Sequence, residues 1–87
     1  MISVWVFKGQ INPFPSAVFS AKELAFEWIS KHKLSGTLTE YHLDQPVIDW
    51  AVEKGYFKPK AEANASQIAN FSSASQEHFH FEDGEMQ

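Results

Sequence analysis

Two histidines and a glutamate alternate near the C-terminal end of the chain, in the pattern His78-x-His80-x-Glu82. Alternate residues of a β-strand share a face, so a strand here would place both imidazoles and the carboxylate side by side. Imidazole and carboxylate groups are ligands of zinc and other transition metals, and His42 could join them from a neighbouring strand. The plainer interpretation is an exposed polar sheet face, because the motif is short and the sequence identifies no group that would orient either imidazole. We expect no metal and no other cofactor, and keep a metal- or ligand-binding protein or enzyme that uses His42, His78 and His80 as the alternative.

No set of residues for covalent catalysis is evident. The chain has no cysteine, and its serines lie in expected caps and loops, without a G-x-S-x-G turn or a histidine spaced to activate one. Carboxylate pairs such as Asp44 with Asp49 are more simply explained as helix-capping and solvated charges. The four glycines are isolated, so no phosphate-binding loop is expected. The sequence therefore predicts a protein that is not an enzyme and has no catalytic residues.

Size and composition indicate a single soluble domain over residues 1–87. The chain is too short for two hydrophobic cores, and its three Trp, eight Phe and two Tyr supply the large side chains that one core needs.

No apolar stretch approaches the ~18 residues that cross a bilayer, and the N-terminus lacks the basic region of a signal peptide. We expect a cytoplasmic protein without a membrane partner. The net charge of -4 opposes direct binding to nucleic acid and favours a basic partner.

The first half of the chain predicts two strands and a helix. Residues 2–8 are apolar on both faces, which is typical of an interior strand, and residues 17–19 form a short return strand after a proline-containing loop. Ser20 and Glu23 match a capping box, so a helix is expected to begin there and to end at Ser35-Gly36. Its apolar stripe includes Trp28 and Ile29.

The second half predicts a strand, a helix and a last strand. Residues 37–43 alternate, with Leu38 and His42 on one face and the threonines on the other. Asp44 is expected to cap a short helix that ends at Gly55 in a left-handed conformation. Residues 58–67 are small and polar and indicate a mobile connection, followed by a marginal helical turn over residues 66–74. Residues 77–82 alternate as a strand, and residues 83–87 are expected to be a frayed tail.

Together these elements predict a two-layer α+β fold. Its sheet is small, mainly antiparallel and built of three or four strands, with two helices on one face, in the order β(β)αβαβ. Each helix has one apolar stripe, so the second face of the sheet is expected to stay open. Whether Trp5 and Phe7 point to that open face is left undecided by the sequence.

Acidic and imidazole side chains are the candidates for a binding surface. They occur at the expected strand ends and on the second helix, where carboxylates would surround a mixed aromatic and imidazole patch. Their simpler interpretation is ordinary solubilising charge. The candidate partner-binding residues are Glu40, His42, Asp44, Asp49, Glu53, Glu77, His78, His80 and Glu82.

Five motifs carry a resemblance to a known family. The chain contains, in order, VWVFxG, FPSxVFS, LSGTLTxY, DWA and EHFHFExG, which together span nearly its whole length, whereas residues 61–67 match none of them. This pattern resembles a family of small bacterial proteins that are similar to immunity proteins of contact-dependent growth inhibition systems. Such proteins neutralise a toxin domain by binding it tightly.

The resemblance implies a protein partner. That partner would be the C-terminal domain of a cognate toxin, with an RNase that has a basic active site as the leading expectation, and the chain would bind it as a monomer. An acidic inhibitor suits a basic surface because opposite charges speed association and block the sites that hold phosphate. An accessory subunit of a larger complex remains a further alternative.

Overall fold

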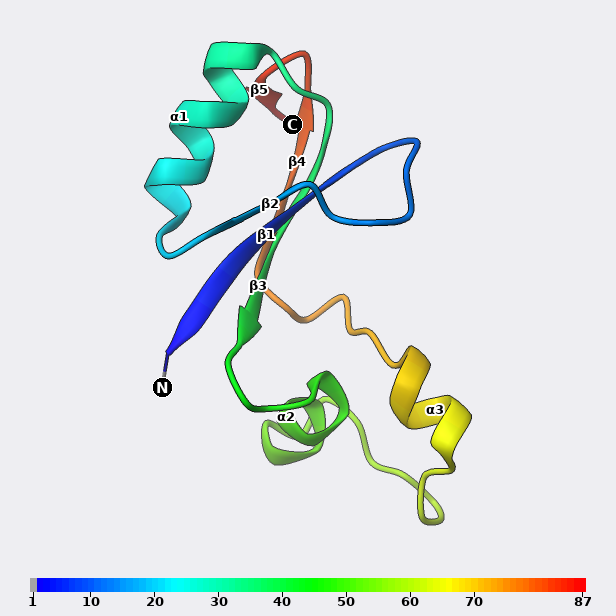
Figure 1. Ribbon diagram of the computed structural model, residues 1–87. Coiled ribbons are helices and arrows are strands. Elements are labelled where there is room, and N and C mark those ends of the chain that lie inside the picture. Colours follow the sequence, from blue (N-terminus) through cyan, green and yellow to red (C-terminus); the bar gives the residue numbers. More distant parts are fainter. Residues whose placement is uncertain (1) are drawn as a thin grey trace.

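The computed structural model describes residues 2–87 as one antiparallel sheet with three helices (Figure 1). The strands follow the spatial order β2-β1-β3-β4-β5, and every neighbouring pair is antiparallel. The predicted two-layer α+β fold is thereby confirmed, with five strands in place of three or four. The elements are β1 (Ser3–Gly9), β2 (Ala17–Phe19), α1 (Lys22–His32), β3 (Gly36–His42), α2 (Val47–Glu53), α3 (Ala65–Asn70), β4 (His78–Glu82) and β5 (Glu85–Met86).

The main core lies between α1 and one face of the sheet. Phe7 pairs with Leu38 across β1 and β3, and Leu38 pairs with Phe79 across β3 and β4, so these side chains form one apolar layer. Ala25 and Ile29 of α1 are completely buried against it. Because Trp5 and Phe7 both belong to this core, the open face receives the valines of β1 instead of an aromatic pair.

Helix α1 begins one residue later than the capping box predicts. Its N-cap is Ala21, without a side-chain hydrogen bond, so the prediction that Ser20 caps this helix is wrong. At the other end Lys33 adopts a left-handed conformation, with φ of 53°, and the following backbone N–H of Leu34 donates to the carbonyl oxygen of Ile29. This closing turn ends the helix and directs the chain into β3.

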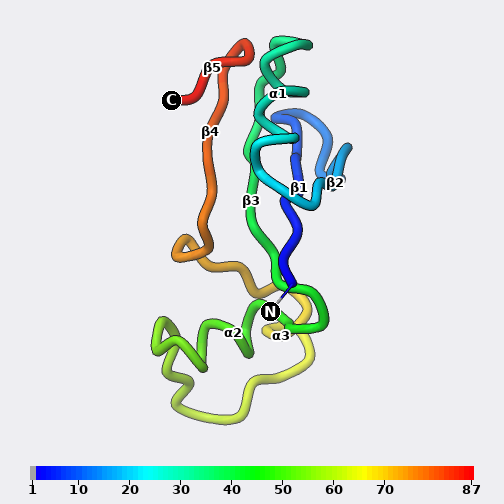
Figure 2. The backbone as a smooth tube through the Cα atoms, turned by 90° about the vertical axis from the view of Figure 1, so that its left-hand side faces the viewer, coloured from blue at the N-terminus to red at the C-terminus, as the bar shows by residue number. Residues whose placement is uncertain are grey.

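The other two helices lie beyond one end of the sheet, whereas α1 lies near the opposite end (Figures 1 and 2). The expectation that a second helix covers the sheet face beside α1 is therefore corrected. Helix α2 begins at Pro46 as its N-cap and not at Asp44, while Gly55 has the expected positive φ of 80°. The turn at Asp44, with φ of 60°, leads the chain past the end of β3, where Trp50 of α2 packs on His42 at 5.9 Å between ring centroids.

Two aromatic pairs lie beside α2 and α3. The ring of Trp50 packs on Tyr56 at 5.4 Å between centroids, and Phe57 packs on Phe71 at 4.9 Å. Helix α3 begins within the segment expected to be a mobile connection, because Asn64 and Gln67 form a reciprocal capping box there.

The C-terminal residues 83–87, expected to be frayed, form a turn and a strand. β5 pairs with the end of β4, and the backbone N–H of Gln87 donates to the carbonyl oxygen of His80 at 2.8 Å. Gly84, with φ of 84°, makes the turn, and its N–H donates to the carbonyl oxygen of Leu34. A left-handed turn that also bonds to the end of α1 holds this segment in place.

Within residues 2–87, no helix has the length and apolar character that crossing a membrane requires.

Candidate functional site

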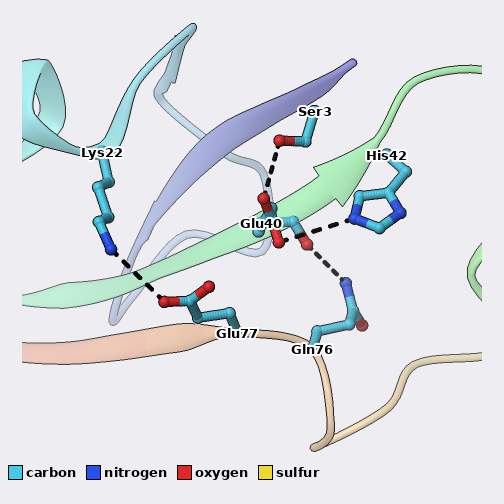
Figure 3. Close-up of polar contacts among 6 residues, drawn as sticks. All are labelled: Ser3, Lys22, Glu40, His42, Gln76 and Glu77. Carbon is cyan, nitrogen blue, oxygen red and sulfur yellow. Dashed lines mark hydrogen bonds and ion pairs between the residues drawn. The ribbon is translucent and has the colours of Figure 1, made fainter. Parts of the chain in front are cut away.

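Four of the expected binding residues meet where β3 leads into α2. Glu40 pairs with Trp5 across the sheet and so lies on the face that α1 covers, and His42, two residues further along β3, lies on the same face. Glu77 is next to Glu40, because the N–H of Glu40 donates to the carbonyl oxygen of Glu77. Figure 3 shows these side chains on the stretch of sheet between α1 and α2. Glu53 reaches the same region through Gln45, whose amide donates to its carboxylate at 2.8 Å.

The carboxylate of Glu40 is held from two sides (Figure 3). The hydroxyl of Ser3 donates to its Oε2 atom at 2.8 Å, and its Oε1 atom lies 3.7 Å from Nε2 of His42. These contacts reach it from β1 and from its own strand. Since the side chain is only one quarter exposed, the Glu40 carboxylate has a fixed position and not a mobile one.

Glu77 pairs with a lysine that also covers the aromatic core. Lys22 places its Nζ atom 3.6 Å from the Glu77 carboxylate, and 5.7 and 5.9 Å from the ring centres of Phe79 and Trp5. The two partners of this ion pair are substantially exposed, so the pair itself adds little stability. The positive charge of Lys22 offsets the negative charge of Glu77 at the border of the site.

Gln76 supplies the buried polar link of this region. It is only 7% exposed, and its side-chain amide donates to the carbonyl oxygen of Glu40 at 3.1 Å while its oxygen accepts from the N–H of Ser73 at 3.2 Å. Both contacts satisfy backbone groups that would otherwise be unpaired in a partly buried place. The segment that follows α3 is thereby fixed to β3.

A small cavity lies between these groups and α2. Its volume is about 20 Å³, and its walls include His42, Gln45 and Trp50. The ring of Trp50 stands perpendicular to His42 at 5.9 Å. Nδ1 of His42 and Oε1 of Gln45 are buried without a hydrogen-bond partner. A space of this size is too small for a metabolite.

The remaining acids, in and just before α2, are exposed. Asp44 lies in the turn between β3 and α2, with φ of 60°, and Asp49 is in the first turn of α2. Among residues 2–87 the ion pair is that of Lys22 with Glu77, and the contact of His42 with Glu40 is ionic only when the imidazole is protonated. Asp44, Asp49 and Glu53 take part in neither contact. We call Glu40, Asp44, Asp49, Glu53 and Glu77 the acidic surface.

His78, His80 and Glu82 lie on the opposite face of the sheet. His78 and His80 pair with the threonines of β3, and their rings are 5.1 Å apart and nearly perpendicular. Nδ1 of His78 is 2.7 Å from the carbonyl oxygen of Gln76, so that nitrogen donates and Nε2 is free. The three histidines considered for a metal site therefore do not meet, because His42 lies on one face of the sheet and His78 and His80 lie on the other.

Within residues 2–87, no three His, Asp or Glu side chains are grouped as metal ligands would be. Ser3, Gln45, Gln76 and Trp50 belong to the site, although no motif in the sequence predicts this. Ser3 and Gln76 each act through one long-range contact to β3, and no local sequence signal marks such a contact.

A family model described as "Domain of unknown function (DUF7710)" matches residues 4–87 of the chain. Comparison with curated proteins and with solved structures finds no match.

Proposed function

The chain belongs to the DUF7710 family, and we propose that it is an immunity-type inhibitor. It binds and neutralises a cognate toxin domain in the cytoplasm by covering a basic active site. The toxin is the C-terminal domain of a contact-dependent growth inhibition protein, and an RNase is the expected activity. The observation that carries this proposal is the acidic surface, in which five carboxylates lie on β3, on α2 and on the segments next to them.

Unpaired surface charge is suited to a partner of opposite sign. Asp44, Asp49 and Glu53 are exposed, and their mutual repulsion in the free protein would be relieved by lysines and arginines of the partner. A nuclease must have such basic groups to hold phosphates, so the surface that binds its substrate also attracts an acidic inhibitor. Complementary charge raises the association rate, which favours rapid neutralisation of a toxin.

The acidic surface is also held in shape before any partner binds. Glu40 is fixed by Ser3, and Glu53 by Gln45, each through a hydrogen bond of 2.8 Å. Side chains that are already ordered lose less conformational entropy on association, so more of the attraction remains as affinity. His78, His80 and Glu82 face away from this surface and are not part of the proposed interface.

The test is co-expression with the reading frame next to the gene of this chain. That frame is expected to encode a toxic domain, and the chain is expected to restore growth and to form a stable complex with it. A neighbouring frame without toxicity, or toxicity that the chain does not relieve, contradicts the proposal. If a pull-down returns a large non-toxic assembly, the protein is an accessory subunit instead.

Two matched charge-reversal variants test whether α2 forms the interface with the toxin. The pair Asp49→Lys and Glu53→Lys is expected to weaken toxin binding about tenfold or more, because it opposes the basic partner. The pair Glu23→Lys and Glu27→Lys on exposed positions of α1 changes the net charge by the same amount. It should affect binding much less. Equal losses from both pairs would mean that only overall charge matters and that α2 is not the interface.

A further inference from the structure

One edge of the sheet is free of charge and rich in exposed apolar side chains. Residues 10–21 contain no Asp, Glu, Lys, Arg or His, although 21% of the chain is charged. Ile11, Phe14 and Val18 in this segment are 99%, 74% and 63% exposed. Single exposed apolar residues are ordinary, but three within eight residues form a surface that is costly to keep in water.

The segment is ordered in this exposed shape. The N–H of Phe14 donates to the side chain of Asn12 at 2.9 Å, and the N–H of Ser16 donates to the carbonyl oxygen of Phe7 at 2.9 Å. Pro13 and Pro15 restrict the backbone between these bonds. The exposed aromatic ring is therefore presented by a stiff loop, which lowers the entropy lost when it binds.

The strand that follows this loop has an unpaired edge. β2 is the first strand in the spatial order of the sheet and pairs only with β1. Edge strands are commonly protected from pairing with another chain by charges, which β2 lacks, and by short length, which limits pairing here to three residues. The opposite edge differs, because Glu85 of β5 pairs with Glu82 of β4 and places two carboxylates there.

A groove adjoins the far end of β2. It is lined by Phe19, Leu24 and Trp28, with Glu27 and Lys31 at its border. Leu24 is half exposed although it lies on the first turn of α1. The loop with Phe14 precedes β2 in the chain, whereas the groove adjoins Phe19 at the other end of this strand.

We propose that two copies of this chain pair through β2 in an antiparallel, two-fold symmetric dimer. Pairing centred on Val18 brings Ala17 of one copy opposite Phe19 of the other, and places the Phe14 loop of each copy at the end of β2 where the groove of its partner begins. Each exposed Phe14 then reaches the groove of its partner, and the two sheets join edge to edge. The contact is self-complementary, as a two-fold interface requires.

The charge distribution selects a second copy as the occupant. Two molecules that each have a net charge of -4 repel, and residues 10–21 are where they can approach with least repulsion. A basic partner would be attracted to carboxylates instead, and β2 offers it none. The dimer does not depend on the proposed toxin binding, because the acidic surface is built on β3, the end of β4 and α2.

Sedimentation of the free chain over a concentration series tests the dimer. The mass is expected to rise from monomer to dimer, and added salt should strengthen the association because it screens the repulsion. Toxin binding through the acidic surface should instead weaken with salt. Failure of one proposal therefore leaves the other intact.

Two variants at exposed positions test whether β2 and its preceding loop form the dimer contact. Val18→Lys places equal charges opposite each other at the two-fold axis, and Phe14→Asp removes the aromatic anchor. Each is expected to raise the dimer dissociation constant about tenfold or more. Ile68→Lys on α3 alters a half-exposed apolar residue far from β2 and should leave dimerisation unchanged. Circular dichroism verifies that each variant is folded. A chain that stays monomeric throughout the series, or a dimer that both edge variants leave intact, overturns the proposal.

Discussion

Gln76 donates a hydrogen bond of 3.1 Å from its side-chain amide to the main-chain carbonyl oxygen of Glu40. The two residues are 36 positions apart, so this bond joins the segment after α3 to the strand that forms the acidic surface. The second contact of Gln76, with Ser73, shapes the turn that leads into β4. One buried amide therefore bonds both to β3 and to the turn before β4.

Replacing this amide tests that connection. Gln76→Leu keeps the apolar part of the side chain but leaves the carbonyl oxygen of Glu40 and the N–H of Ser73 unpaired. We expect the free energy of unfolding to fall by about 2 kcal/mol, which is typical for a buried polar group that loses its partner. Chemical denaturation measures this. Gln10→Leu makes the same change at an exposed residue and should have little effect. Similar losses in both variants would contradict the role of Gln76.

A second prediction concerns the close approach of β1 and β3 at Gly36. A Cβ atom there would collide with the carbonyl oxygen of Lys8 and lie 2.7 Å from Cζ of Phe7. Both neighbours belong to a paired strand and a filled core, so neither can move freely. Gly36→Ala is expected to cost about 3 kcal/mol of stability, the upper range for overpacking a core.

Gly9 provides the matched control for that substitution. It pairs directly with Gly36, yet a Cβ atom at Gly9 would meet only the carbonyl oxygen of Ser35, at an ordinary 4.0 Å. Gly9→Ala should therefore change stability by less than about 1 kcal/mol. Thermal unfolding of the two variants gives the comparison. Equal effects would mean that the crowding at Gly36 is relieved by backbone movement.

Strand alternation was the most informative sequence signal. It correctly placed Leu38 and His42 on one face of β3, and His78 and His80 on the face of β4 away from Phe79. Local periodicity does not state how two strands are aligned, so the three histidines could still be imagined in one site. Only the pairing of Leu38 with Phe79 shows that they lie on opposite faces.

Helix positions were harder to predict because they depend on contacts distant in sequence. The apolar stripe of α2 suggested a place on the sheet, but Trp50 packs on His42 and Tyr56 beyond its end. Likewise the polar segment 83–87 offered no apolar pattern. Its order comes from backbone bonds to residues 34 and 80, which no local pattern reveals.

A third prediction follows for the C-terminal hairpin. Removing residues 83–87 deletes the bonds of Gly84 to Leu34, Asp83 to Ser35 and Gln87 to His80. At about 1 kcal/mol or less for each bond, stability should fall by about 2 kcal/mol. Denaturant titration of the shortened chain measures the loss. No loss would show that this segment is frayed in solution.

Alanine substitutions at two glycines distinguish the packing of this hairpin from the cost of its left-handed backbone conformation. Gly84 and Gly55 have φ of 84° and 80°, so alanine at either position costs about 1 kcal/mol from the left-handed conformation. A Cβ atom at Gly84 would also lie 2.8 Å from Cα of Lys33, whereas at Gly55 it would meet open space. Gly84→Ala is therefore expected to be clearly more destabilising than Gly55→Ala. Equal losses would mean that the hairpin is not packed against the end of α1.

The last prediction concerns the bond from Ser3 to Glu40, which fixes the central carboxylate of the acidic surface. Ser3→Ala and Glu40→Gln each remove or weaken it, and the double variant completes a cycle that isolates the interaction. Because the bond is to a charged group at a partly buried position, we expect a coupling energy of about 1 kcal/mol in denaturant unfolding. The contact of Glu40 with His42 remains in Ser3→Ala, so that variant should fold normally and keep the other carboxylates in place. If the single effects simply add, the hydroxyl does not hold the carboxylate, and the acidic surface is less ordered than the proposed inhibitor requires.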